Sequence, residues 1–145
     1  MSEINLQASA DLILKLYEIR REPEMRLARQ WFAREFRPQN AQEIIRLFLS
    51  GERPSAAYRM VTSYWEMCAA MVNRGAIDSE LFRSSNGEHI GFFSILEPFL
   101  AELRSATGEA DYLVQWEKLV RETPGATERL EARRQLFAAW TKQAP

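Results

Sequence analysis

The chain is poor in the side chains that most often carry chemistry. Its 145 residues include one cysteine, one histidine and three aspartates. The single cysteine, Cys68, excludes an internal disulfide and any zinc site built on cysteines. No glycine-rich phosphate loop, Ser/His/Asp arrangement or His-Glu-x-x-His motif occurs. We therefore expect no metal and no cofactor, and the scarcity of acid–base groups argues against an enzyme.

Long apolar runs and a strong charge of one sign are also missing. The longest apolar stretches span only a few residues, far short of the roughly 20 that cross a bilayer. Glu3 lies where a signal peptide would carry basic residues. The net charge of −1 argues against nucleic acid or a membrane surface as the partner. We expect a cytoplasmic protein without a transmembrane segment.

What the sequence does contain is helical periodicity along nearly its whole length. Apolar residues recur at helical spacing, and no segment alternates as a strand does. The apolar fraction of 46% and the charged fraction of 27% suit a globular domain. These features predict one all-α domain over residues 1–145, a bundle of about seven to eight helices. We expect helices over 8–49 to pack on a core over 55–122, followed by a helix over 127–142.

The segment from Ser55 to Arg74 is predicted to form the central helix. Ser55 is a suitable N-cap, and Gly75 suits the left-handed position after the last turn. The helix is apolar over most of its circumference, which is typical of a helix buried in a bundle. A later helix is predicted from Asp111 to Arg121.

Two more helices are predicted to follow the central one, joined by a polar elbow. Asp78 is expected to cap a short helix that ends at Phe82. A longer helix is expected to begin near Glu88 and to end at Gly108. Pro98 inside that helix should kink it, because proline removes one backbone hydrogen bond.

Arg83 and His89 flank this elbow and are the only candidate catalytic pair. Their Arg-x5-His spacing resembles the Arg-x(4–6)-His signature of HEPN-type ribonucleases, helical bundles whose Arg and His act on the scissile phosphate, usually across a dimer. Histidine can act as a general acid or base, and arginine can bind a phosphate. A metal-independent ribonuclease is therefore the alternative function. The simpler interpretation is a histidine at a helix start in a solvated elbow, because frequent arginines produce this spacing readily by chance.

A surplus of apolar helix surface indicates a possible protein interface. Methionines adapt to irregular contacts, and a helix that is apolar all round needs a second surface to cover it. The same side chains would alternatively fill the core. The candidate interface residues are Met60, Tyr64, Met67, Met71, Trp31 and Phe32.

A run of small motifs also connects the central helix to its successors. The residues are Arg74, Gly75, Ile77, Asp78, Pro98, Leu103 and Arg104. They resemble a family of small bacterial helical proteins known only as a domain of unknown function, in which an RG-x-ID step leads through a short helix to a P-x(3–4)-LR helix. The resemblance covers residues 58–122. It implies a helical bundle and a bacterial source, and it supplies no activity. Some members carry an N-terminal membrane helix, for which this sequence offers no apolar stretch.

The scarcity of catalytic groups and the surplus of apolar surface together favour one function. We expect a non-catalytic protein-interaction or regulatory module that binds another protein or a second copy of itself, as a homodimer.

Overall fold

Eight α-helices make up the part of the chain that the computed structural model describes, residues 5–143, with side chains described as far as residue 140. This part contains no strand, so the predicted all-α, single-domain class is confirmed. None of its helices is both long and apolar enough to cross a membrane. The helices are α1 (Leu6–Arg21), α2 (Pro23–Arg34), α3 (Ala41–Leu49), α4 (Arg53–Asn73), α5 (Ser79–Ser85), α6 (Glu88–Thr107), α7 (Val114–Arg121) and α8 (Ala126–Gln143).

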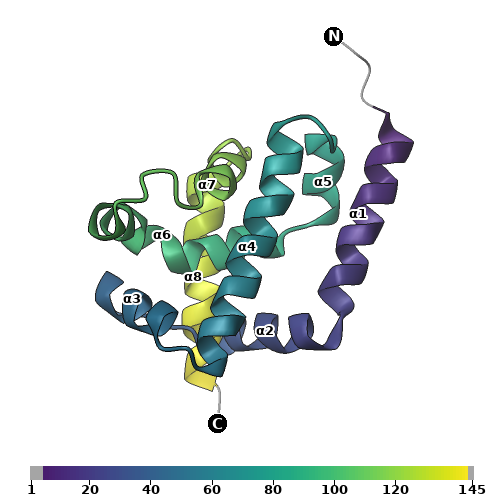
Figure 1. The fold of residues 1–145 in the computed structure, drawn as a ribbon. Coiled ribbons are helices and arrows are strands. Elements are labelled where there is room, and N and C mark those ends of the chain that lie inside the picture. Colours follow the sequence, from purple (N-terminus) through teal and green to yellow (C-terminus); the bar gives the residue numbers. More distant parts are fainter. Residues whose placement is uncertain (1–4, 144–145) are drawn as a thin grey trace.

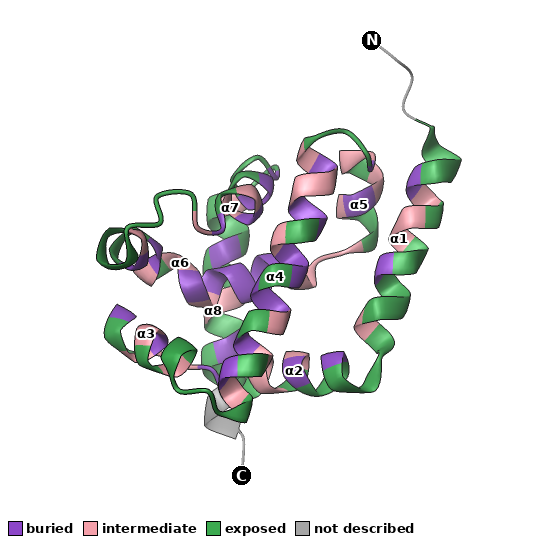
Figure 2. Cartoon of the chain, viewed as in Figure 1, coloured by how far each residue is buried: buried purple, intermediate pink, exposed green. Residues whose placement is uncertain are grey.

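The central position of α4 organises the bundle (Figure 1). Helices α2, α3 and α7 pack on α4, and α8 packs on α6. Figure 2 shows buried positions along α4 and α6, whereas α1 is exposed along most of its length. Helix α1 contacts α2 and α5. The predicted burial of the central helix is therefore confirmed, whereas α1 lies at the edge of the bundle.

Aromatic side chains fill much of the core. Trp65 of α4 and Trp116 of α7 are the largest of the fully buried side chains. Phe32 of α2 is also fully buried, and its ring centroid lies 4.7 Å from that of Phe92 on α6. Each such ring removes a large apolar area from water. These contacts join α2, α4, α6 and α7 through one continuous cluster.

Several helix ends lie where local signals predict them. Gly75 and Gly108 have φ angles of +83° and +74°, the left-handed conformation that glycine adopts without strain. Asn40 caps α3 by accepting a hydrogen bond from the Glu43 amide, and Asp78 caps α5. These caps depend only on neighbours within a few residues, which is why the sequence reveals them.

The predicted start of the central helix is wrong. Helix α4 begins at Arg53, and Ser55 lies inside its first turn rather than at the N-cap. Pro54 occupies one of the first two helical positions, where its missing N–H costs nothing. The buried Ser55 hydroxyl instead donates to the Phe48 carbonyl oxygen at 2.9 Å. That bond joins the first turn of α4 to the end of α3.

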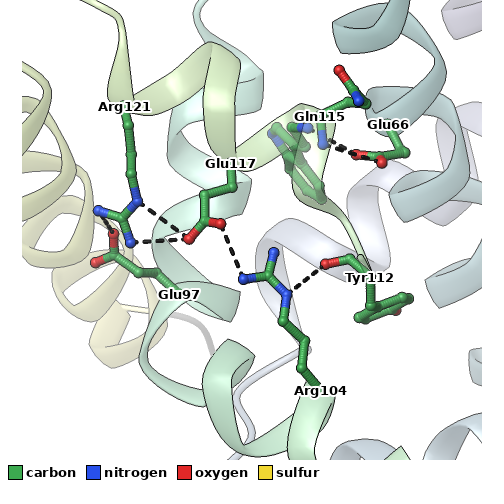
Figure 3. Close-up of polar contacts among 8 residues, drawn as sticks. Glu66, Glu97, Arg104, Tyr112, Gln115, Glu117 and Arg121 are labelled. Atoms are coloured by element: carbon green, nitrogen blue, oxygen red, sulfur yellow. Dashed lines mark hydrogen bonds and ion pairs between the residues drawn. The ribbon is translucent and has the colours of Figure 1, made fainter. Parts of the chain in front are cut away.

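Helix α7 begins at Val114, three residues later than predicted, because its cap comes from another helix. The carboxylate of Glu66 on α4 accepts hydrogen bonds from the backbone amides of Gln115 at 3.2 Å and Trp116 at 2.8 Å (Figure 3). Leu113, just before the helix, has a φ angle of +56°. Glu66 precedes these amides by about 50 residues, so no local pattern announces the cap.

The helix before the elbow is longer than predicted, and the helix after it has the predicted bounds. Helix α5 continues past Phe82 to Ser85, which leaves only two residues before α6. Helix α6 runs through Pro98 as one element and ends at Gly108 as expected. The kink at Pro98 stays a prediction.

Replacing Glu66 tests the cap on α7. Glu66→Ala leaves two amides at the start of α7 without their acceptor, so the free energy of unfolding should fall by about 1–2 kcal/mol. Urea denaturation followed by circular dichroism measures this change. Glu102→Ala, an exposed position late in α6, is the matched control and should shift stability by no more than about 0.5 kcal/mol. Equal losses in the two variants would contradict the cap.

Candidate functional site

One of the two candidate residues at the elbow between α5 and α6 points into the core. His89, the second residue of α6, has no exposed surface. Its ring lies 5.3 Å from that of Phe82 and 5.6 Å from that of Trp65. Neither ring nitrogen has a hydrogen-bond partner among the described residues. The histidine therefore packs as an aromatic core side chain.

Burial and surrounding charge keep His89 neutral. Burial, and after it the positive charges of Arg129, Arg83, Arg133 and Arg20 in that order, together lower the pKa of His89 from 6.5 to about 3. An imidazole with this pKa is a poor proton carrier near neutral pH. His89 forms its hydrogen bond in the core through the backbone, where its carbonyl oxygen accepts from Trp116 Nε1 at 3.0 Å.

Arg83 serves a structural contact of its own. Its Nη2 donates to the Leu119 carbonyl oxygen at 3.3 Å, which ties α5 to α7. No hydrogen bond joins Arg83 to the His89 ring, because both ring nitrogens lack a partner. A catalytic pair must converge on a cleft open to substrate. With His89 at 0% exposure, the two side chains form no such cleft.

The neighbouring Glu88 contacts the N-terminal helices and holds them in place. Arg29 of α2 donates to both of its carboxylate oxygens, at 2.8 Å from Nε and 2.5 Å from Nη2. Arg20 of α1 adds a third contact at 3.3 Å, and its Nη1 donates to the Asn86 side chain at 2.9 Å. The hydrogen bonds that Arg29 donates to Glu88 raise the pKa of Arg29, against the opposing effect of burial. This charge cluster fastens α1 and α2 to the start of α6.

A second charge cluster joins α6, α7 and α8 on another part of the molecule. Arg104 donates from Nε to the Tyr112 carbonyl oxygen at 2.9 Å and pairs with Glu117 at 3.0 Å (Figure 3). Arg121 bridges Glu117 and Glu97. Glu97 also pairs with an arginine of α8. The carboxylates of Glu97 and Glu117 and the guanidinium groups of Arg104 and Arg121 therefore take part in contacts that hold these helices together.

The lone cysteine is also unsuited to chemistry. Cys68 is fully buried on α4, as predicted. Burial raises the pKa of its thiol to about 12, so the nucleophilic thiolate does not form near neutral pH. Among the described residues, no group of three or more His, Cys, Asp or Glu side chains is placed to hold a metal ion.

Two of the predicted interface residues face the core instead. Phe32 is fully buried, and Tyr64 is buried with its hydroxyl donating to the Leu16 carbonyl oxygen at 2.7 Å. Neither is available to a partner, because the periodicity of α2 and α4 places them on the inward faces. Met60, Met71 and Trp31 are half-buried, and Met67 is 38% exposed.

Trp31 and Met60 line one apolar groove between α2 and the start of α4. The groove has a volume of about 380 Å³. Leu27, which is 58% exposed, lies on the same wall as Trp31, one helical turn earlier. Helix α2 thus has two apolar faces: one buries Met25 and Phe32, and the other faces this groove. The sequence does not single out Leu27 as a surface residue. Its four-residue spacing to Trp31 is the same spacing that apolar residues of a core-facing helix show.

The family described as "Domain of unknown function (DUF4760)" matches residues 5–123, which is more than half of the sequence. The chain belongs to this family. The match covers α1 to α7 and leaves α8 outside, so it is wider than the resemblance over 58–122. No curated protein and no solved structure matches the chain.

The motif residues behind the family resemblance have structural roles. Gly75 takes the left-handed position after α4, and Asp78 caps α5. Ile77 and Leu103 are buried, and Arg104 binds the loop before α7. In this DUF4760 member the motif therefore specifies how the helices connect.

The pH dependence of the free energy of unfolding tests the burial of His89. The unfolded chain takes up a proton on His89 below pH 6.5, whereas the folded chain resists it until about pH 3. Stability therefore falls as pH falls through this window, with a slope that approaches about 1.4 kcal/mol per pH unit. His89→Phe should remove this component, since carboxylates titrate alike in both proteins. Chemical denaturation at several pH values measures the two slopes, and parallel curves for the two proteins would contradict the account.

Proposed function

We propose that this protein is a non-catalytic interaction module that self-associates, with a second copy docking on the groove between α2 and α4. The observation that carries the proposal is a contrast: the reactive side chains are buried, whereas an apolar surface is exposed. His89 and Cys68 are fully buried, whereas Leu27 on the wall of the groove is 58% exposed. A module of this kind works through its surface alone.

The lining of the groove supports a protein partner. Its walls are mainly apolar, and both helices contribute side chains to it. Hydrophobic grooves between two helices are a common way to receive a helix of another chain. The apolar lining comes from Leu27, Ala28 and Trp31 on α2 and from Pro54, Ala56, Ala57 and Met60 on α4.

The charges around the groove favour a second copy as the occupant. Glu24 and Glu35 lie on the α2 wall, and Arg53 lies at the α4 wall. None of the three forms an ion pair within the described residues. A two-fold axis through the groove would set the acidic wall of one copy opposite the basic wall of the other. Such self-complementarity is what an isologous dimer requires.

The ribonuclease alternative lacks comparable support. It requires Arg83 and His89 to reach a phosphate, and the His89 ring is enclosed by Trp65 and Phe82. Arg83 donates to a backbone carbonyl of α7 instead. The surface groove is therefore the better basis for a function.

Sedimentation velocity over a range of concentrations tests the dimer. The wild type should self-associate, and Leu27→Glu should weaken the dimer at least tenfold, because each copy loses a buried leucine and gains a buried charge. Leu49→Glu is the matched control, since Leu49 is 75% exposed but lines a separate groove beside α3. It should leave association unchanged. A strictly monomeric wild type, or a loss confined to Leu49→Glu, would contradict the proposal.

A charge swap tests the two-fold pairing itself. Arg53→Glu should weaken homodimers roughly tenfold, because both copies then oppose like charges. The double variant Glu24→Arg with Glu35→Arg should do the same. A mixture of the two variants should form heterodimers as tight as the wild-type dimer, measured by sedimentation with one partner labelled. Heterodimers no tighter than either homodimer would exclude this arrangement.

A further inference from the structure

A strongly basic surface lies on the other side of α2 from the groove. A hollow of about 710 Å³ opens between α2, the first turn of α6 and α8, and a smaller one of about 310 Å³ adjoins it beside α1. Arg26 and Arg29 line both hollows, so the two form one site. Of the described residues that line it, one is a carboxylate, Glu88. The lining arginines are Arg20, Arg21, Arg26, Arg29, Arg34 and Arg133.

The one carboxylate does not neutralise this surface. Glu88 is already bound by Arg29 and Arg20. Arg26, Arg34 and Arg133 form no ion pair within the described part of the chain. Since the whole chain carries a net charge of −1, the excess of basic charge is local to this site.

The close approach of α8 to α6 positions Arg133 in the site. A Cβ atom at Gly91 would lie 2.9 Å from Cε2 of Phe137, a distance that side chains do not adopt. A Cβ atom at Gly87 would lie 3.0 Å from Nη2 of Arg133. The two glycines therefore let α8 pack against the first turn of α6 and bring the Arg133 guanidinium over it. The backbone N–H groups at the N-terminus of α6 add to the positive potential there.

An aromatic contact holds another arginine of the site. The guanidinium carbon of Arg34 lies 5.6 Å from the ring centroid of Trp140, which stacks on Phe137. A ring face orients the guanidinium without using its N–H donors. Arg34 therefore lines the hollow while forming no ion pair with a carboxylate of the described residues.

From this arrangement we propose that the site binds a small molecule carrying two or more phosphate groups, of the size of a nucleoside diphosphate. Arginine presents paired donors that match phosphate oxygens. Small-molecule sites usually have volumes of about 300–1,000 Å³, the range into which both hollows fall. The arginines are spread over two adjoining hollows, so a single phosphate contacts only part of the set. Two linked phosphates engage both.

Isothermal titration calorimetry with the full chain tests this site, using inorganic phosphate, pyrophosphate and ADP as probes. Pyrophosphate and ADP should bind at least tenfold more tightly than inorganic phosphate. Arg26→Gln and Arg34→Gln should each weaken binding roughly tenfold, the usual effect of losing one charge-assisted hydrogen bond. Both arginines are exposed, so the variants should keep the helical content of the wild type. Arg46→Gln, an exposed position on α3, is the matched control and should bind as the wild type does.

Three results would overturn the proposal. The first is no measurable binding of pyrophosphate or ADP to the wild type. The second is equal weakening in Arg46→Gln and the two site variants, which would indicate attraction by overall charge. The third is binding only to single-stranded RNA or to vesicles of anionic lipid, which would make this surface a contact for a macromolecule instead.

Discussion

The first turn of α6 is the constraint on which the rest of the structure depends. It presents two adjacent side chains in different directions, Glu88 toward the N-terminal helices and His89 into the core. The shared carboxylate of Glu88 connects α1 and α2 to α6 through Arg20 and Arg29. The carboxylate and both guanidinium groups are each at most 22% exposed, so loss of one partner would leave charge poorly solvated. The same turn supports Arg133 and borders the basic hollow.

Much of the fold could be predicted because its signals are local. Helical spacing and caps such as Asn40 and Gly108 act through neighbours in the sequence. The start of α4 has a local marker in Pro54, whereas the start of α7 depends on a residue from another helix and could not be predicted. Ser55 bonds to α3 instead of capping its own helix, and Glu66 caps α7 from α4. Such long-range caps exist only once the helices have packed.

The candidate site was harder to predict, because function here depends on which way a side chain points. Arg83 and His89 have a suggestive spacing, but a rotation of about half a turn around the helix axis separates a solvent-facing histidine from a buried one. Phe32 and Trp31 are neighbours in the sequence, and the first fills the core while the second lines the surface groove. The basic hollow combines arginines of the consecutive helices α1 and α2 with Arg133 of α8, which lies far from them in the sequence. Only the packing of these helices gathers them.

The central claim is that the elbow is a structural joint, with His89 sealed and neutral. The most direct measurement is an NMR titration of the His89 ring in a tag-free protein, which is unambiguous because the chain has one histidine. The account predicts ring shifts that stay constant from about pH 7 down to about pH 4.5, because burial and the neighbouring arginines together lower the pKa of His89 to about 3. A titration midpoint near 6.5, the value of a solvated histidine, would show an accessible imidazole and contradict the account.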